Sequence, residues 1–237
     1  MKILALDSSG LIASVAVVED ENLLAEYTVN YKKTHSQTLM GMLDEIVRMT
    51  ELELGTLDAI AVAGGPGSFT GLRIGSATAK GLGLAIGKPI IKIPTVDALA
   101  YNLCGAKGLV CPMMDARRNQ VYTGIFRFEG SCLITVKEQM AADVMEVIEI
   151  LNAQKEQVTF LGDGIPVYRN KIEESMTAPC YFAPPHLNKQ RAGAVASLAE
   201  IYFREGKTES AAEHVPEYLR LSQAERERRE KEQLKND

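Results

Sequence analysis

A glycine-rich segment, residues 64–75, constrains the fold of this chain more than any other stretch. It reads Gly-Gly-Pro-Gly-Ser-Phe-Thr-Gly-Leu-Arg-Ile-Gly and follows the apolar run 59–63. A short apolar run that ends in clustered glycine and proline indicates a buried strand leaving a sheet. Ser68 or Thr70 can cap a helix that continues without proline to Ile86. The segment therefore predicts a strand, a tight loop and a helix.

The predicted helix carries a stripe of small residues, in which Gly71, Gly75, Ala79 and Gly83 recur every fourth position. Glycine inside a helix costs about 1 kcal/mol relative to alanine, so the stripe needs a reason. The glycine loop could bind a phosphate through its backbone N–H groups, or the stripe could pack against a partner helix or inside its own domain. Because the loop lacks the Gly-Lys-Ser/Thr ending of a P-loop, we favour the close approach of a partner helix.

Composition narrows the classes of function. The chain has 237 residues, 46% of them hydrophobic, and a formal net charge of -5, which argues against a protein that grips nucleic acid by itself. The sequence has no apolar run near the roughly 20 residues of a membrane span. The N-terminus reaches Asp7 too soon for a signal peptide, so we expect a cytoplasmic protein without membrane contact.

The chain shows an internal duplication. Residues 1–104 read as three strands followed by alternating helices and strands, and the strand 109–115 repeats the opening pattern of a strand that ends in aspartate. The predicted fold is a mixed α/β protein with two similar lobes of the βββαβαβα type, residues 1–104 and 105–221. Residues 222–237 form a tail of alternating charges for which we predict no function.

Five segments carry a resemblance to a known family: residues 6–9 (Leu-Asp-Ser-Ser), 35–37 (His-Ser-Gln), the glycine-rich segment, 115–118 (Asp-Ala-Arg-Arg) and 216–220 (Pro-Glu-Tyr-Leu-Arg). Together they resemble the bacterial TsaB (YeaZ) family. The duplicated strand–aspartate–turn–strand pattern resembles the wider actin/sugar kinase/Hsp70 (ASKHA) superfamily.

The resemblance implies a role in making N6-threonylcarbamoyladenosine (t6A) at position 37 of tRNAs that read codons beginning with A. In that family the related protein TsaD transfers the threonylcarbamoyl group, and TsaB is its non-catalytic, dimerising partner. The ATPase TsaE joins the pair, TsaB alone tends to form a homodimer, and tRNA is reached only through the complex. ATP and metal are expected on the partner proteins, with no cofactor bound by this chain alone.

The residues themselves argue against catalysis. TsaD carries two histidines one helical turn apart, but here Leu39 follows His35 at that spacing, so we predict no metal site. We predict that any nucleotide cleft is vestigial, because a serine replaces a glycine in the first turn and the second turn contains no glycine. The residues of this predicted cleft are Asp7, Ser8, Ser9, Asp115, Arg117 and Arg118. The two arginines could pair with a phosphate or an acidic partner, or be plain exposed turn residues.

We predict that the helices 34–49 and 71–86 bind TsaD in a four-helix contact. The predicted interface residues are His35, Leu39, Met40, Met42, Leu43, Thr70, Gly71, Arg73, Gly75, Thr78, Ala79, Leu82 and Gly83. The alternatives are a small-molecule kinase, in which Asp7 or Asp115 would hold Mg-ATP, and a metallopeptidase-like enzyme.

Overall fold

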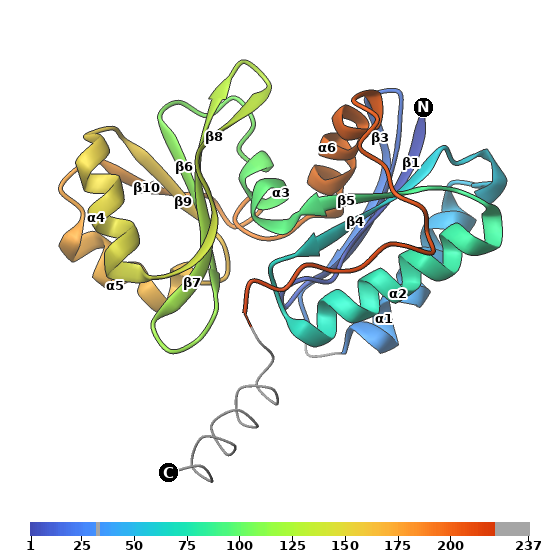
Figure 1. Cartoon of the computed structure of the whole chain (residues 1–237), viewed down its shortest axis with the longest axis horizontal. Helices are drawn as coiled ribbons and strands as arrows, with labels where there is room; N and C mark the ends of the chain where they lie inside the picture. The colour runs from blue at the N-terminus through green and yellow to red at the C-terminus, as the bar shows by residue number, and fades with distance from the viewer. Residues whose placement is uncertain (32–33, 221–237) are drawn as a thin grey trace, which may run out of the picture.

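The computed structural model describes residues 1–31 and 34–220, and each of its two lobes is built on a five-stranded sheet (Figure 1). The first sheet contains β1 (Lys2–Asp7), β2 (Ala13–Glu19), β3 (Asn22–Val29), β4 (Ala59–Gly65) and β5 (Ile90–Pro94). The second contains β6 (Leu109–Asp115), β7 (Gln120–Glu129), β8 (Cys132–Asp143), β9 (Val158–Leu161) and β10 (Cys180–Phe182). The helices are α1 (His35–Met49), α2 (Phe69–Ile86), α3 (Thr95–Tyr101), α4 (Val144–Gln154), α5 (Ile165–Ser175) and α6 (Ala192–Arg204).

The two sheets have the same topology, which confirms the predicted duplication and the ASKHA-like α/β fold. Their strand orders are β3-β2-β1-β4-β5 and β8-β7-β6-β9-β10. In each, an antiparallel meander of three strands is extended by two parallel strands. None of the helices in the part of the chain that the structure describes is long and apolar enough to cross a membrane.

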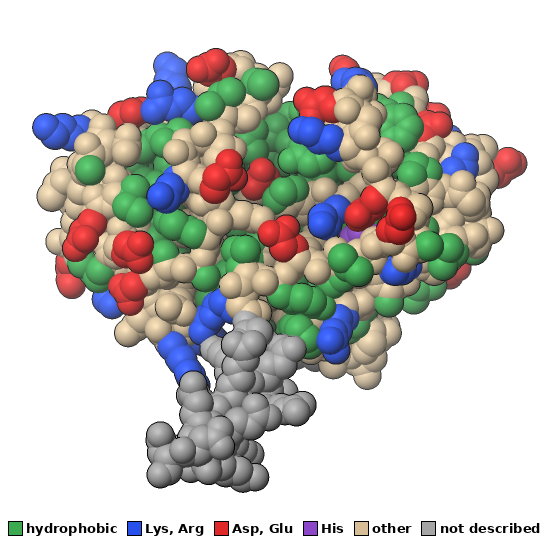
Figure 2. All heavy atoms as spheres, in the orientation of Figure 1, with side chains coloured by type: hydrophobic (Ala, Val, Ile, Leu, Met, Phe, Trp, Pro, Cys, Tyr) green, Lys and Arg blue, Asp and Glu red, His purple; other side chains and the backbone are tan. Residues whose placement is uncertain are grey.

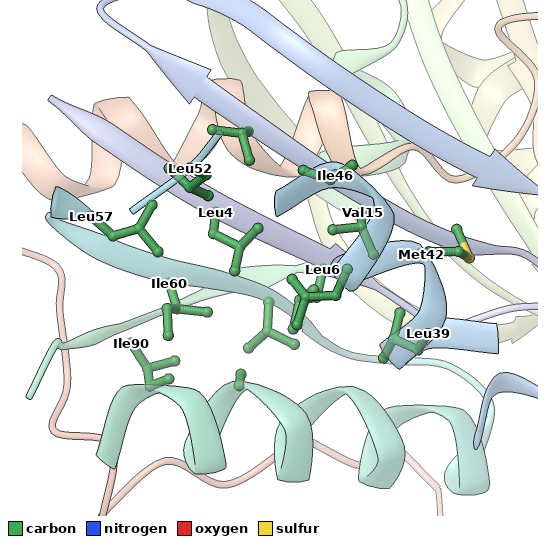
Figure 3. Packing of buried hydrophobic residues seen from close by; sticks show 14 of the residues in the cluster. Leu4, Leu6, Val15, Leu39, Met42, Ile46, Leu52, Leu57, Ile60 and Ile90 are labelled. Carbon is green, nitrogen blue, oxygen red and sulfur yellow. The ribbon is translucent and has the colours of Figure 1, made fainter. Parts of the chain in front are cut away.

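The first sheet is buried on both faces, because alternate residues of a strand point to opposite sides. Leu4 and Leu6 pack under α1 and α2, whereas Ile3 and Ala5 pack against α6. Figure 3 shows the first of these cores, in which side chains from the strands meet those of α1 above α2. Burial of each large aliphatic side chain stabilises the lobe by about 1.5–3 kcal/mol.

The two halves exchange helices, which corrects the predicted boundary between lobes. The helix α6 lies on the first sheet, where Val195 and Ala199 fill the core beside Ile3. The helix α3 instead buries Val96 and Leu99 against the second sheet. The chain after α6 also returns to the first lobe, so the prediction that residues 105–221 form one lobe is wrong for their last third.

The helices and strands agree with the sequence prediction only in part. Ser68, one of the two predicted caps, caps α2 and accepts the Gly71 N–H at 3.3 Å. The hydroxyl of Thr95, the first residue of α3, accepts the Gly65 N–H. The helix α5, which has a proline in its first turn, and the strand β10, which has only three residues, were not predicted.

Candidate functional site

The motif segments meet at the end of the first lobe that faces the second. The glycine loop lies directly on the β1–β2 turn, where the Ser68 N–H donates to the Ser9 carbonyl at 2.6 Å. A Cβ atom at Gly67 would overlap the Ser9 carbonyl, and one at Gly71 would overlap the Ser8 carbonyl. Glycine is required here because two backbones approach with no room for a side chain.

Three N–H groups of the glycine segment are used inside the protein. That of Gly65 donates to the Thr95 hydroxyl at 3.1 Å and that of Gly71 to the Ser68 hydroxyl, while Ser68 donates to Ser9. A phosphate loop must offer several free N–H groups to one anion. In this structure these three N–H groups already have partners, which favours the packing interpretation of the loop over phosphate binding.

The small-residue stripe of α2 packs against the chain's own first lobe. A Cβ at Gly75 would lie 2.6 Å from the Ser8 hydroxyl, and one at Gly83 would lie 2.8 Å from the Ala211 side chain. Ala79 is fully buried and Gly71 faces the β1–β2 turn. The prediction that these four residues form a free surface for a partner is therefore corrected: they serve packing within the domain.

The apolar face of α1 also points inward. Leu39, Met42 and Leu43 are buried against the first sheet, so they do not supply the exposed apolar surface that we predicted (Figure 3). Of the remaining predicted interface residues, Met40 is 55% exposed. Those that reach the surface fully or in part are Met40, Thr70 and Arg73, and then His35, Thr78 and Leu82.

Residues 209–220, called here the C-terminal strap, run back over α2. Glu209 pairs with Ile90 at the edge of the first sheet. His214 is buried and bonds the Ser76 hydroxyl at 2.9 Å and the Glu209 carboxylate at 2.6 Å, and Lys80 donates to two strap carbonyls. A Ser–His–Glu chain resembles a hydrolase relay, but Ser76 is only 3% exposed and offers no open hydroxyl to a substrate. The chain of bonds fastens the strap.

The last residues of the strap reach the glycine loop and the second lobe. The Glu217 N–H donates to the Gly64 carbonyl at 2.7 Å, and the Tyr218 ring lies 4.6 Å from that of Phe69. Arg220 donates to the Ala116 carbonyl in the β6–β7 turn at 2.8 Å. This explains the Pro-Glu-Tyr-Leu-Arg motif as a connection between the lobes. Sequence reasoning could not place it, because its contacts lie more than 100 residues away.

The predicted vestigial cleft is closed on the side of the first lobe. Asp7, Ser8 and Ser9 are buried, and the Asp7 carboxylate accepts the Ser9 N–H at 2.9 Å and the Ser9 hydroxyl at 2.6 Å. Burial raises the pKa of Asp7 to about 6, and the bonds from Ser9 oppose that rise. His35 donates to the Gly10 carbonyl at 2.8 Å and so fixes the start of α1 on the same turn.

The second-lobe side of the cleft is open. Asp115 is exposed; it accepts the Arg117 N–H at 2.9 Å and the Tyr168 hydroxyl at 3.1 Å. Arg117 and Arg118 are also exposed, and Asp163 accepts the Asp115 N–H. Within residues 1–31 and 34–220, no group of three acidic, histidine or cysteine side chains is placed to hold a metal ion.

A pocket of 670 Å³ opens where α1 and α2 begin, a feature that sequence reasoning missed. His35, Thr70 and Ile74 contribute to its wall, and Leu11 and Tyr31 also line it, although they are 70% and 72% exposed. An exposed apolar pair beside a cavity is typical of an interaction site. The one signal in the sequence is Leu11 itself, an apolar residue placed in a turn.

The fold defines the class of protein. It matches an inorganic polyphosphate/ATP-glucomannokinase from Arthrobacter sp. strain KM with a TM-score of 0.51 at 13% identity, over 86% of this chain and 99% of that one. This likeness concerns the fold alone. With the duplicated sheets, it shows that the chain has an ASKHA-like fold.

Three findings give the family. The model for "TsaD: tRNA N6-adenosine threonylcarbamoyltransferase" matches residues 22–228. The tRNA threonylcarbamoyladenosine biosynthesis protein TsaB of Bacillus subtilis (strain 168) is 32% identical over 228 residues, 95% of this chain and 96% of that protein. The structure of YeaZ from Pseudomonas aeruginosa matches with a TM-score of 0.74 at 26% identity, over 92% of this chain and 99% of that one. The chain belongs to the TsaB (YeaZ) family, as the sequence motifs indicated.

Proposed function

We propose that this chain is a non-catalytic subunit that supports t6A formation at adenosine 37 of tRNAs reading codons that begin with A. The observation that carries the proposal is the closed turn of the first lobe: Asp7 is buried with Ser9, and three N–H groups of the glycine segment are bonded inside the protein. A buried carboxylate beside engaged N–H groups does not suit the binding of a triphosphate and its metal ion. The work of the chain is then to bind and position a catalytic partner.

The partner surface in this proposal is the pocket at the start of α1 and α2 with its apolar surroundings. Leu11 and Tyr31 line the pocket and are more than half exposed, as is Met40 further along α1, and Thr70 and Arg73 lie near the start of α2. Exposed apolar side chains next to a concave surface suit a helix of a related protein. TsaD is the partner proposed, and the same surface would form the homodimer when TsaD is absent.

The remaining partners are those that the resemblance to the family implies. TsaE would join the pair, ATP and metal would be bound by the partners, and the tRNA would be engaged in the assembled complex in the cytoplasm. This chain would hold no cofactor of its own. The burial of Asp7 argues against the kinase alternative, and the described residues hold no group of three acidic, histidine or cysteine side chains that would support the metallopeptidase alternative.

The test is co-purification with TsaD after placing a charge on the proposed surface. Leu11→Asp and Met40→Asp are exposed changes that leave the cores intact, and each should lower TsaD affinity by about tenfold or more. Val167→Asp is the matched control, since Val167 is 60% exposed on α5 in the other lobe. Unchanged TsaD binding by both surface variants would show that the surface is assigned wrongly. A chain that never binds TsaD would refute the function.

A further inference from the structure

A continuous row of arginine and aromatic side chains crosses the junction between the lobes. The Arg73 guanidinium lies 4.1 Å from the centre of the Phe69 ring, whose neighbour on the strap is Tyr218. Two residues further, Arg220 binds the carbonyl that precedes Arg117 and Arg118. We call these six residues the arginine ladder. Figure 2 shows Lys and Arg side chains along this lower edge, on both sides of the place where the described chain ends.

The β6–β7 turn holds its arginines in an unfavourable backbone conformation. Arg117, Arg118 and Asn119 have φ angles of 63°, 56° and 59°. A left-handed conformation costs roughly 1–2 kcal/mol for a residue with a side chain, and glycine would avoid the cost. Strain of this kind is kept where the side chains have a task. Neither arginine side chain forms an ion pair with an acidic residue that the structure describes.

We propose that the arginine ladder binds single-stranded RNA, namely the loop of the tRNA that the complex modifies; this rests on the proposed function. Guanidinium groups bind phosphates with paired hydrogen bonds, and unstacked bases pack on exposed aromatic rings. Tyr218, 39% exposed, offers such a ring beside Phe69, on which the Arg73 guanidinium packs. An acidic protein surface would pair with the arginines but would make no use of the stacked rings.

The charges around the ladder suit a surface that assists RNA binding within the complex rather than one that binds RNA by itself. The acidic side chains beside the ladder are Asp115, which accepts the Arg117 backbone N–H, Asp163, which accepts the Asp115 N–H, and Glu217 on the strap. Four arginines therefore outnumber these three carboxylates in a chain whose net charge is -5. The field of the whole protein repels RNA, so the ladder adds to RNA binding in the complex.

The test replaces the strained arginines by the residue that their backbone prefers. Arg117→Gly/Arg118→Gly removes two charges and should keep or raise the stability, because glycine suits a positive φ. Lys155→Gly is the matched control: Lys155 also has a positive φ, 55°, and is exposed at the far end of α4. The start of α4 contacts Asn119, so its 11 residues place Lys155 about 16 Å away.

Binding of an unmodified tRNA transcript to the complex with TsaD and TsaE is measured at several salt concentrations. The double variant should bind about tenfold more weakly, and its log–log salt slope should fall by about 1–2. Lys155→Gly should leave both unchanged. Equal affinity and slope in all three proteins would overturn the proposal.

Two further outcomes separate the proposal from the function on which it rests. If the double variant no longer binds TsaD but its affinity for tRNA is unchanged, the two arginines contact a protein. This result would also overturn the assignment to RNA. If the chain never binds TsaD, the proposed function fails, and a single-stranded oligoribonucleotide added to the isolated chain at low salt decides the inference. Binding in the wild type that the double variant lacks supports it, and no binding in either refutes it.

Discussion

The two lobes place equivalent turns at the cleft, but one turn is buried and the other is exposed. The β1–β2 turn and the β6–β7 turn each follow a strand that ends in aspartate, Asp7 and Asp115. Asp7 is 1% exposed and bonded to Ser9, whereas Asp115 is exposed and followed by two arginines in a left-handed conformation. One copy of the duplicated motif has closed and the other has stayed open.

The difference originates in the loop that follows the fourth strand of each lobe. In the first lobe the glycine loop reaches over the neighbouring turn and covers Ser8 and Ser9. In the second lobe the corresponding turn packs on β6 instead, where a Cβ at Gly162 would overlap the Met113 carbonyl. A turn of the duplicated motif can therefore be closed by a neighbouring loop as well as changed in its chemical groups. The Gly162-Asp163-Gly164 turn is a plain connection between strand and helix.

Substitution of Gly71 should disrupt the closed β1–β2 turn more than any other change. In Gly71→Ala the new methyl group would overlap the Ser8 carbonyl, a backbone atom that has no freedom to rotate away. We expect a loss of about 3 kcal/mol in the free energy of unfolding, measured by urea denaturation. Gly81→Ala is the matched control on the same helix, since nothing lies within 4 Å of its Cβ position, and it should stabilise the chain by about 1 kcal/mol. Equal effects of the two changes would mean that the turn is not closed by the loop.

The closed turn should also make the stability of the chain depend on pH. Burial raises the pKa of Asp7 from 3.8 to about 6, so between these values the folded chain holds a proton that the unfolded chain has released. Stability therefore falls as pH rises through this window, by about 3 kcal/mol in total. Asp7→Asn keeps an oxygen for Ser9 and removes the titration, so its advantage over the wild type should grow from pH 4 to pH 7.

Urea denaturation at each pH measures this difference between the two proteins. Burial also raises the pKa of Asp97, to about 7, but that group titrates in both proteins and cancels. Parallel profiles for wild type and Asp7→Asn would show that Asp7 is not closed off from water.

Much of the fold could be predicted from the sequence, because it depends on local patterns. The apolar runs of β1 and β4, the Ser68 cap and the repeated strand–aspartate–turn each act within a few residues. The same patterns also revealed the family motifs. The exchange of α3 and α6 between the sheets could not be predicted, since an apolar helix face does not indicate which sheet it covers.

The candidate site was harder to predict from the sequence than the fold, for the same reason. The stripe from Gly71 to Gly83 correctly indicated close backbone packing, but its neighbours, Ser8 and Ala211, lie far away in sequence. Small residues allow a close approach without specifying what approaches. Met40 and Arg73 were placed correctly at the surface, whereas the pocket beside Leu11 depends on a turn whose position only the folded chain defines.

The smallest expected effect concerns the bond that joins the closed lobe to the open one. Arg220→Ala removes the hydrogen bond to the Ala116 carbonyl, worth about 1 kcal/mol, and should loosen the end of the strap. The Glu217 N–H, bonded to Gly64, should then exchange with solvent about fivefold faster, as native-state hydrogen exchange would measure. Arg204→Ala is the control, because it removes an exposed ion pair with Glu21 away from the strap. Unaltered exchange at Glu217 in Arg220→Ala would mean that the first lobe holds the strap alone, and that the open turn is free to move independently of the closed one.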